Sequence, residues 1–324
     1  MSINNLPTGI LEHIFSYLDN QSMQDAISVC KLWEQIIGNS SKFMKKFKFQ
    51  LPSSTNCQEI VKFPKIPLKN IRIKHIKDPL HAEFIADAFK DYKSTIESLE
   101  FSHLHADNKM LTNIFNSIDN LKELSFNCAI INLNTSGTGD DDKNFRFNLP
   151  NLRSLSIYTN FCVNACRWQA MKEDPAEKIL SYFWNNQTIE TFSIQFYGGH
   201  AYYFNTRIFC AFLNSLKNLK HLILLSCNKS LIEFPFSLGL QKLEIDSLYY
   251  FDGHIELLLY LKDSLKELRL VQTTYNPRNY KKEKPLIKFI IDKLNLENFY
   301  VEDIPIILNG KIQDAAVKDF IVNE

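Results

Sequence analysis

The chain has 324 residues, of which 45% are hydrophobic and 23% are charged, so its composition excludes a largely disordered protein and favours a globular one with a sizeable core. The net charge of +1 lacks the basic excess of proteins that bind nucleic acid or an anionic membrane, and we expect neither partner. The sequence contains no apolar run of membrane-spanning length and no secretory signal pattern, which predicts a soluble protein of the cytoplasm or nucleus.

The residues that carry chemistry are few and scattered. Seven cysteines lie far apart along the chain, which favours reduced, buried thiols over a disulfide framework. Cys162 and Cys166 have no second pair to complete a zinc site, and His103 and His105 have no partner carboxylate or thiols. Because no phosphate-binding glycine loop, nucleophile elbow or metalloprotease motif is present either, we expect no catalytic residue, no metal and no cofactor.

The first elements are three short helices. Apolar residues recur at helical spacing from Pro7 to Leu18, and a second such pattern begins at Ser22, where Asp25 completes a weak capping box. A third helix is predicted from Lys31 to Ile37, with a stop at Gly38. A unit this small buries little surface, so we expect it to need support from another surface.

These helices carry a recognisable order of residues: Leu-Pro, then Ile-Leu and Ile-Phe pairs, then Val-Cys and Trp. In this order the segment, residues 1–50, resembles the F-box family. The resemblance implies binding to the Skp adaptor of a Skp-cullin-F-box ubiquitin ligase and, through the adaptor, to the cullin. The residues that it implies in adaptor binding are Leu6, Pro7, Ile10, Leu11, Ile14, Phe15, Val29, Cys30 and Trp33.

One position departs from the family pattern. Gly9 replaces the usual acidic residue before the Ile-Leu pair, and it lowers helix propensity by up to about 1 kcal/mol relative to alanine. We therefore expect a reduced affinity for the adaptor. The alternative is that the three helices only cap the end of the domain that follows, with their apolar face turned inward.

A lysine-rich segment and a connector come next. Lysines alternate with Phe43, Met44, Phe47 and Phe49, and we expect the lysines to cover the join between the two domains while the apolar residues pack beneath. Membrane or nucleic-acid contact is the less favoured interpretation of this stretch. Residues 51–67, rich in proline and small polar residues, are predicted to form a connector.

From Leu68 onward one template recurs about every 28 residues, with apolar residues at positions 0, 3, 5 and 8, as in leucine-rich repeats. Helical patterns separate most of the copies. Residues 68–324 are thus predicted to form an α/β leucine-rich repeat solenoid of about nine repeats, with a parallel sheet on the concave side and helices on the convex side, closed by a helical cap near residues 311–322. A generic α/β domain is the alternative. The copies begin at Leu68, Ile96, Leu121, Leu152, Ile189, Leu219, Leu240, Leu265 and Leu296.

The side chains between the template positions are expected on the concave face, because side chains alternate along a strand. There, exposed aliphatic residues flanked by aromatic and charged ones are typical of a protein-binding surface. The alternative for Ile223 and Leu225 is packing against neighbouring loops. The candidate substrate-binding residues are Tyr158, Ile223, Leu225, Glu244, Arg269 and Tyr300.

The predicted function is that of a non-catalytic substrate-recognition subunit of a Skp-cullin-F-box ubiquitin ligase. In this interpretation the F-box holds the adaptor, and the repeats hold a target protein whose identity the sequence does not reveal. A leucine-rich repeat scaffold that acts without the ligase is the alternative, and a hydrolase built from the cysteines and histidines is a more remote one.

Overall fold

The computed structural model describes residues 3–51, 64–74, 76, 79–102, 108–127, 146–160, 175–197, 206–225, 239–246, 257–271, 290, 292–301 and 304–308. The chain divides into two compact units, Met1–Leu152 and Arg153–Glu324. The division falls inside the predicted run of repeats, so the compact units do not follow the predicted boundaries at residues 50 and 67. None of the described helices is long and apolar enough to cross a membrane.

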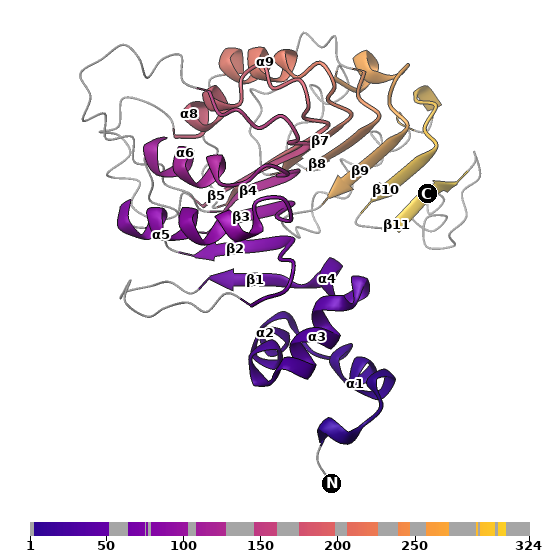
Figure 1. Ribbon diagram of the computed structural model, residues 1–324. Helices are drawn as coiled ribbons and strands as arrows, with labels where there is room; N and C mark the ends of the chain where they lie inside the picture. Colours follow the sequence, from indigo (N-terminus) through magenta and orange to yellow (C-terminus); the bar gives the residue numbers. More distant parts are fainter. Residues whose placement is uncertain are drawn as a thin grey trace. The chain divides into compact units, whose positions relative to one another are not determined.

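The first unit begins with a group of short helices (Figure 1). The second of them starts earlier than predicted, because the Asp19 carboxylate accepts a hydrogen bond of 2.7 Å from the Ser22 N–H and caps the helix in place of Ser22. The third runs through Gly38 instead of stopping before it, and a fourth helix was not predicted. The elements are η1 (Ile3–Asn5), α1 (Thr8–Phe15), α2 (Asn20–Val29), α3 (Lys31–Asn39) and α4 (Ser41–Lys46).

A parallel sheet follows the helices within the first unit. It starts at Lys48, earlier than the predicted first strand near Leu68, because Phe49 and Leu51 alternate with polar residues and are buried. The strands are β1 (Lys48–Leu51), β2 (Asn70–Lys74), β3 (Ser98–Ser102) and β4 (Glu123–Asn127). The helices α5 (Pro79–Phe89) and α6 (Asn108–Asn116) and the short η2 (Lys90–Tyr92) lie between them in the chain.

The second unit repeats this alternation, with β11 pairing antiparallel to β10 after six parallel strands. Ile304, at position 8 of the last template copy, begins β11. The strands are β5 (Ser154–Asn160), β6 (Thr191–Tyr197), β7 (His221–Leu225), β8 (Lys242–Asp246), β9 (Glu267–Val271), β10 (Asn298–Val301) and β11 (Ile304–Leu308). The helices are α8 (Pro175–Tyr182), α9 (Thr206–Ser215) and residues 257–261.

The nine predicted strands are confirmed, and their template positions lie in register. In the first unit Ile71 pairs with Leu99 and Leu99 with Leu124, and all three side chains are buried. In the second unit the corresponding template positions also pair in register: Leu155, Phe192, Leu222, Leu243, Leu268 and Phe299. Aromatic contacts such as Phe192 with Phe212 of α9, 5.2 Å between ring centroids, join strands to helices.

A second periodic feature links successive strands. The backbone carbonyl of Lys69, one residue after the template start, accepts hydrogen bonds from the N–H groups of Glu97 and Ser98, at 2.8 and 3.0 Å. In the second unit the carbonyls of Arg153, Glu190, Lys220, Gln241 and Lys266 each accept the corresponding pair from the next strand. Because the same geometry recurs at these joins, the copies are structural repeats as well as sequence repeats.

The predicted cap at residues 311–322 lies outside the described residues, as do Cys162, Cys166, His103 and His105. Most of residues 51–67, the predicted connector, lie outside them as well.

Candidate functional site

Helix α1 has a buried side formed by Leu11 and Phe15, each 1% exposed. The Phe15 ring meets the Trp33 ring of α3 edge-on, with 5.1 Å between centroids. Leu11 and Phe15 were predicted among the adaptor-contacting residues, but the structure places them in the core, where they hold α1 against α3. The physical reason is that the apolar face of α1 is broad enough to be split between the core and the surface.

The same group of helices also carries large apolar side chains that are exposed. Eight large hydrophobic side chains are exposed among the described residues, and five of them lie before residue 33, with exposed fractions between 38% and 76%. Exposed apolar side chains concentrated in one short domain are candidates for an interaction site. We call the five residues the exposed apolar set: Ile3, Ile10, Tyr17, Val29 and Leu32.

The remaining residues that were predicted to contact the adaptor differ in how exposed they are. Pro7 is exposed, whereas Leu6, Ile14, Cys30 and Trp33 are half-buried. The sequence analysis did not include Ile3, Tyr17 or Leu32. Tyr17 could have been found from its spacing, seven residues after Ile10 on the same helical face.

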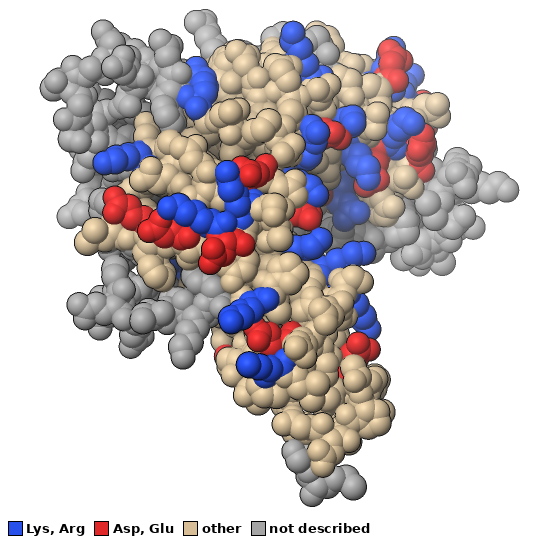
Figure 2. Space-filling model, in the orientation of Figure 1, with Lys and Arg blue, Asp and Glu red and all other residues tan. Residues whose placement is uncertain are grey.

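Trp33 positions the amino-terminal turn. Its indole Nε1 donates to Asn4 Oδ1 at 2.9 Å, which ties η1 to α3 and fixes the backbone that carries Ile3. Few charged groups interrupt this end of the molecule, and Figure 2 shows its surface as mostly uncharged. The arrangement can therefore bury apolar area against a partner with little desolvation of charge.

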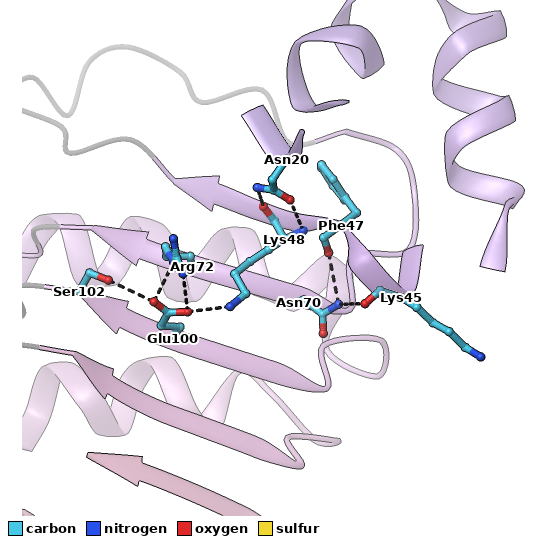
Figure 3. Close-up of polar contacts among 8 residues, drawn as sticks. All are labelled: Asn20, Lys45, Phe47, Lys48, Asn70, Arg72, Glu100 and Ser102. Atoms are coloured by element: carbon cyan, nitrogen blue, oxygen red, sulfur yellow. Dashed lines mark hydrogen bonds and ion pairs between the residues drawn. The ribbon is translucent and has the colours of Figure 1, made fainter. Parts of the chain in front are cut away.

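Helix α2 is fastened to the outer edge of β1. The Asn20 side chain donates to the Lys48 carbonyl at 2.5 Å and accepts from the Lys48 N–H at 2.6 Å (Figure 3). One turn later, Gln24 makes the same pair of bonds to Gln50, at 3.0 and 2.9 Å. The two amides thus satisfy the backbone groups of an edge strand that would otherwise be open to pairing. The helical segment therefore packs on the sheet.

On the polar face of strands β1–β4, Glu100 forms an ion cluster with two cations. Lys48 Nζ lies 2.7 Å from Oε2, and Arg72 Nη2 donates to Oε2 at 3.0 Å. Arg72 Nε lies 2.8 Å from Oε1 without forming a hydrogen bond to it. Burial of the Glu100 side chain, 11% exposed, opposes ionisation, but the hydrogen bonds from Lys48 and Arg72 outweigh it and hold the pKa of Glu100 below its ordinary value.

In the second unit the predicted substrate-binding residues form two rows. Ile223, Glu244, Arg269 and Tyr300 face one another in register across β7–β10, and all are half-buried. The Arg269 guanidinium carbon lies 4.8 Å from the centroid of the Tyr300 ring, a cation–π contact. The structure therefore brings these four residues together.

Tyr158 and Leu225, the other two predicted residues, lie in the next row. Gln195 separates them, because its strand β6 lies between β5 and β7. The row therefore places Tyr158 two strands away from Leu225, on the same face.

A third row, which the sequence analysis missed, contains His221 and Lys242 in register. Both lie two residues before predicted face residues on the same strands, so the alternation of the strands could have indicated them. Burial lowers the pKa of His221, and the neighbouring charge of Lys242 lowers it further. Among the described residues, no group of three or more His, Cys, Asp or Glu is placed to hold a metal ion.

Comparison with known protein families identifies one part of the chain. Residues 3–50 match the F-box-like family, so this segment, from η1 to β1, is an F-box-like domain. The match confirms the predicted F-box and includes every residue of the exposed apolar set. No curated protein matches the chain.

Proposed function

We propose that this protein is the substrate-recognition subunit of a Skp-cullin-F-box ubiquitin ligase. The F-box-like domain binds the Skp adaptor, as F-box domains generally do, and the adaptor connects it to the cullin. The observation that carries the proposal is the coincidence of two findings in one segment. Residues 3–50 are F-box-like, and they hold five of the eight large hydrophobic side chains that are exposed in the described part of the chain. In this proposal Ile10, Tyr17 and Val29 supply the apolar contact, with Pro7 beside them.

The repeats are proposed to be a leucine-rich repeat solenoid with the parallel sheet on its concave side. Three observations support this: the recurring template, the registered rows of buried residues, and the repeated carbonyl geometry between strands. Stacked repeats offer an extended sheet face for binding. A target protein then binds the rows on β5–β10 through Tyr158, Ile223, Leu225, Glu244, Arg269 and Tyr300.

The proposed role is non-catalytic, in the cytoplasm or nucleus. The chain positions a target protein, and ubiquitin transfer belongs to other subunits of the ligase. No cofactor, nucleic acid or membrane is required by this proposal.

Adaptor binding is the decisive test. Full-length chain and purified Skp adaptor are mixed, and the dissociation constant is measured by calorimetry for the wild type and for Ile10→Glu with Tyr17→Ala. We expect at least about a hundredfold loss, because a carboxylate replaces an apolar contact and a large aromatic contact disappears. Tyr260→Ala removes an equally exposed aromatic side chain outside the F-box-like domain and should leave binding unchanged.

The thermal unfolding midpoint of each variant confirms that it has folded. If the folded wild type does not bind the adaptor, or if the double variant binds as tightly as the wild type, the proposed function is wrong.

The alternative, a leucine-rich repeat scaffold that acts without the ligase, rests on Gly9. An ideal Cβ at Gly9 would meet no heavy atom within 4 Å, so this structure shows no packing reason for glycine there. If the departure from the family pattern has removed adaptor affinity, the wild type captures its target without the adaptor, and Gly9→Glu restores adaptor binding.

A further inference from the structure

The polar face of strands β1–β4 carries more cations than anions. Lys48, Arg72 and Lys74 project from β1 and β2 on the side opposite the buried template residues. Glu100 is the carboxylate that Lys48 and Arg72 share, and it is largely covered by them. Both cations keep about a third of their side-chain surface exposed and can accept a second anionic partner.

Helix α4 carries two further lysines beside the start of β2, and Figure 3 shows the Lys45 side chain extending away from the Glu100 cluster. The side-chain amide of Asn70, the first residue of β2, donates to the carbonyls of Met44, Lys45 and Phe47 at 3.3, 3.5 and 3.2 Å (Figure 3). These bonds hold the last turn of α4 beside the start of β2. Lys45 and Lys46 are exposed on that turn. We call Lys45, Lys46, Lys48, Arg72 and Lys74 the basic face.

Three residues of the basic face lack a counter-charge, in contrast to the paired lysines at the strand starts of the same unit. At the strand starts, Lys69 and Lys122 both contact Glu97, at 3.2 and 3.1 Å, so both lysines have a carboxylate partner. Within the described part of the chain, Lys45, Lys46 and Lys74 make no ion pair. Besides Glu100, the described polar face of this sheet presents one other carboxylate, Glu123 of β4, so cations outnumber anions on it.

We propose that the basic face binds an acidic segment of a partner protein, rich in Asp and Glu. The Glu100 cluster shows that this geometry accepts a carboxylate at 2.7 to 3.0 Å from a lysine and an arginine. Because Glu100 already holds Lys48 and Arg72 in place, the binding of a second carboxylate costs less side-chain conformational entropy. Charge complementarity of this kind also raises the rate of association.

The neighbouring side chains favour a protein segment over other polyanions. Asn70, Ser98 and Ser125 beside the basic face are small and uncharged, and none of the eight exposed large hydrophobic side chains lies on β1–β4 or α4. As far as it is described, the face therefore lacks the exposed aromatic platforms on which single-stranded nucleic acid stacks. Its described residues also lack the apolar groups that insert into a membrane interface.

The experiment measures fluorescence anisotropy of a short labelled peptide of alternating Asp, Glu, Gly and Ser with the full-length chain. A peptide with Asn and Gln in place of the acids is the probe control. We expect the acidic peptide to bind, its affinity to fall as salt rises, and Lys45→Gln with Lys46→Gln to weaken binding by about fivefold or more. The matched variant, Lys69→Gln with Lys122→Gln, removes the same charge from compensated positions and should change binding by less than about twofold.

The proposal is wrong if the acidic and amide peptides bind equally, or if the two variants lose the same affinity for the acidic peptide. It is also wrong if anionic vesicles or an RNA oligonucleotide bind at the same lysines while the peptide does not. Adaptor affinity is measured on the same samples. Because the proposal goes beyond the ligase function and does not depend on it, acidic-peptide binding should persist in the Ile10→Glu, Tyr17→Ala variant.

Discussion

Gly38 of α3 and Ile66, which precedes β2, approach so closely that a methyl group on Gly38 would lie 2.3 Å from Ile66 Cγ2 and 2.9 Å from Ile66 Cβ. Both residues are buried, so the F-box-like helices and the start of the repeats pack directly against each other within the first unit. The glycine is required here by packing and not by backbone conformation.

The first prediction concerns this contact. Gly38→Ala should lower the free energy of unfolding by about 1–3 kcal/mol, because overpacking forces Ile66 to move. Gly9→Ala is the matched control: its Cβ enters open space, so it should raise the free energy by up to about 1 kcal/mol through helix propensity. Urea unfolding measures both, and a Gly38→Ala variant as stable as the wild type would show that Ile66 yields without cost.

The second prediction concerns the amides that cover β1. Asn20→Ala with Gln24→Ala should speed hydrogen exchange at the N–H groups of Lys48 and Gln50, because their acceptors are lost. Each substitution should also destabilise the protein by about 1–3 kcal/mol, since buried backbone groups are left without partners. Gln21→Ala, which removes only an exposed bond to Asp25, should leave exchange on β1 unchanged. Unchanged exchange in the double variant would mean that water replaces the amides.

The third prediction follows from the lowered pKa of Glu100. A carboxyl whose folded pKa lies below its unfolded pKa contributes stability above the unfolded value, near 4.5, and loses it as pH falls through the folded value. Glu100→Gln should therefore be less stable than the wild type by about 1–3 kcal/mol at neutral pH. The difference should shrink as pH falls below about 4.5. A pH-independent difference in urea unfolding would indicate a packing effect and not a charge effect.

The fourth prediction concerns His221. Its folded pKa is lowered by burial and by Lys242, so the folded state holds fewer protons than the unfolded state just below pH 6.5. Its contribution to stability is complete above that value and declines as pH falls through it toward the folded pKa. NMR titration of the imidazole should give a midpoint below 6.5, and Lys242→Gln should move it upward. A midpoint at or above 6.5 in the wild type would contradict the burial seen here.

The strands of the repeats could be predicted from the sequence because each depends on a local pattern that tertiary contacts only reinforce. Leu99, Phe101 and their counterparts are apolar at fixed spacing, and on strands β2 to β9 all of them are buried, as is Phe299 of β10. The periodicity of α1 also indicated a helix correctly. Which part of its broad apolar face turned inward depended on α3, however, and so Leu11 and Phe15 were misplaced on the surface.

Other features depend on contacts between residues far apart in the sequence. Strand β1 has no template of its own and is recognisable only through its pairing with β2 and the amides of Asn20 and Gln24. The Glu100 cluster joins residues of three strands, and no local pattern marks it. The rows on the second unit were predicted in part, because alternation gives the face of a residue but not its neighbours on adjacent strands.

The last prediction tests the face proposed to bind a target. Arg269 stacks on Tyr300, while Ile223 and Leu225, both on β7, present aliphatic groups two strands away from Arg269, so their combined replacement removes both apolar and cationic contacts. Proximity labelling under proteasome block should identify proteins captured by the wild type, and Ile223→Ser, Leu225→Ser and Arg269→Gln together should abolish labelling of the true target. The Ile10→Glu, Tyr17→Ala variant should keep that labelling but lose the adaptor and the cullin. If the triple variant, folded by its thermal unfolding midpoint, labels the same proteins as the wild type, then Ile223 and Leu225 serve only to pack against neighbouring loops.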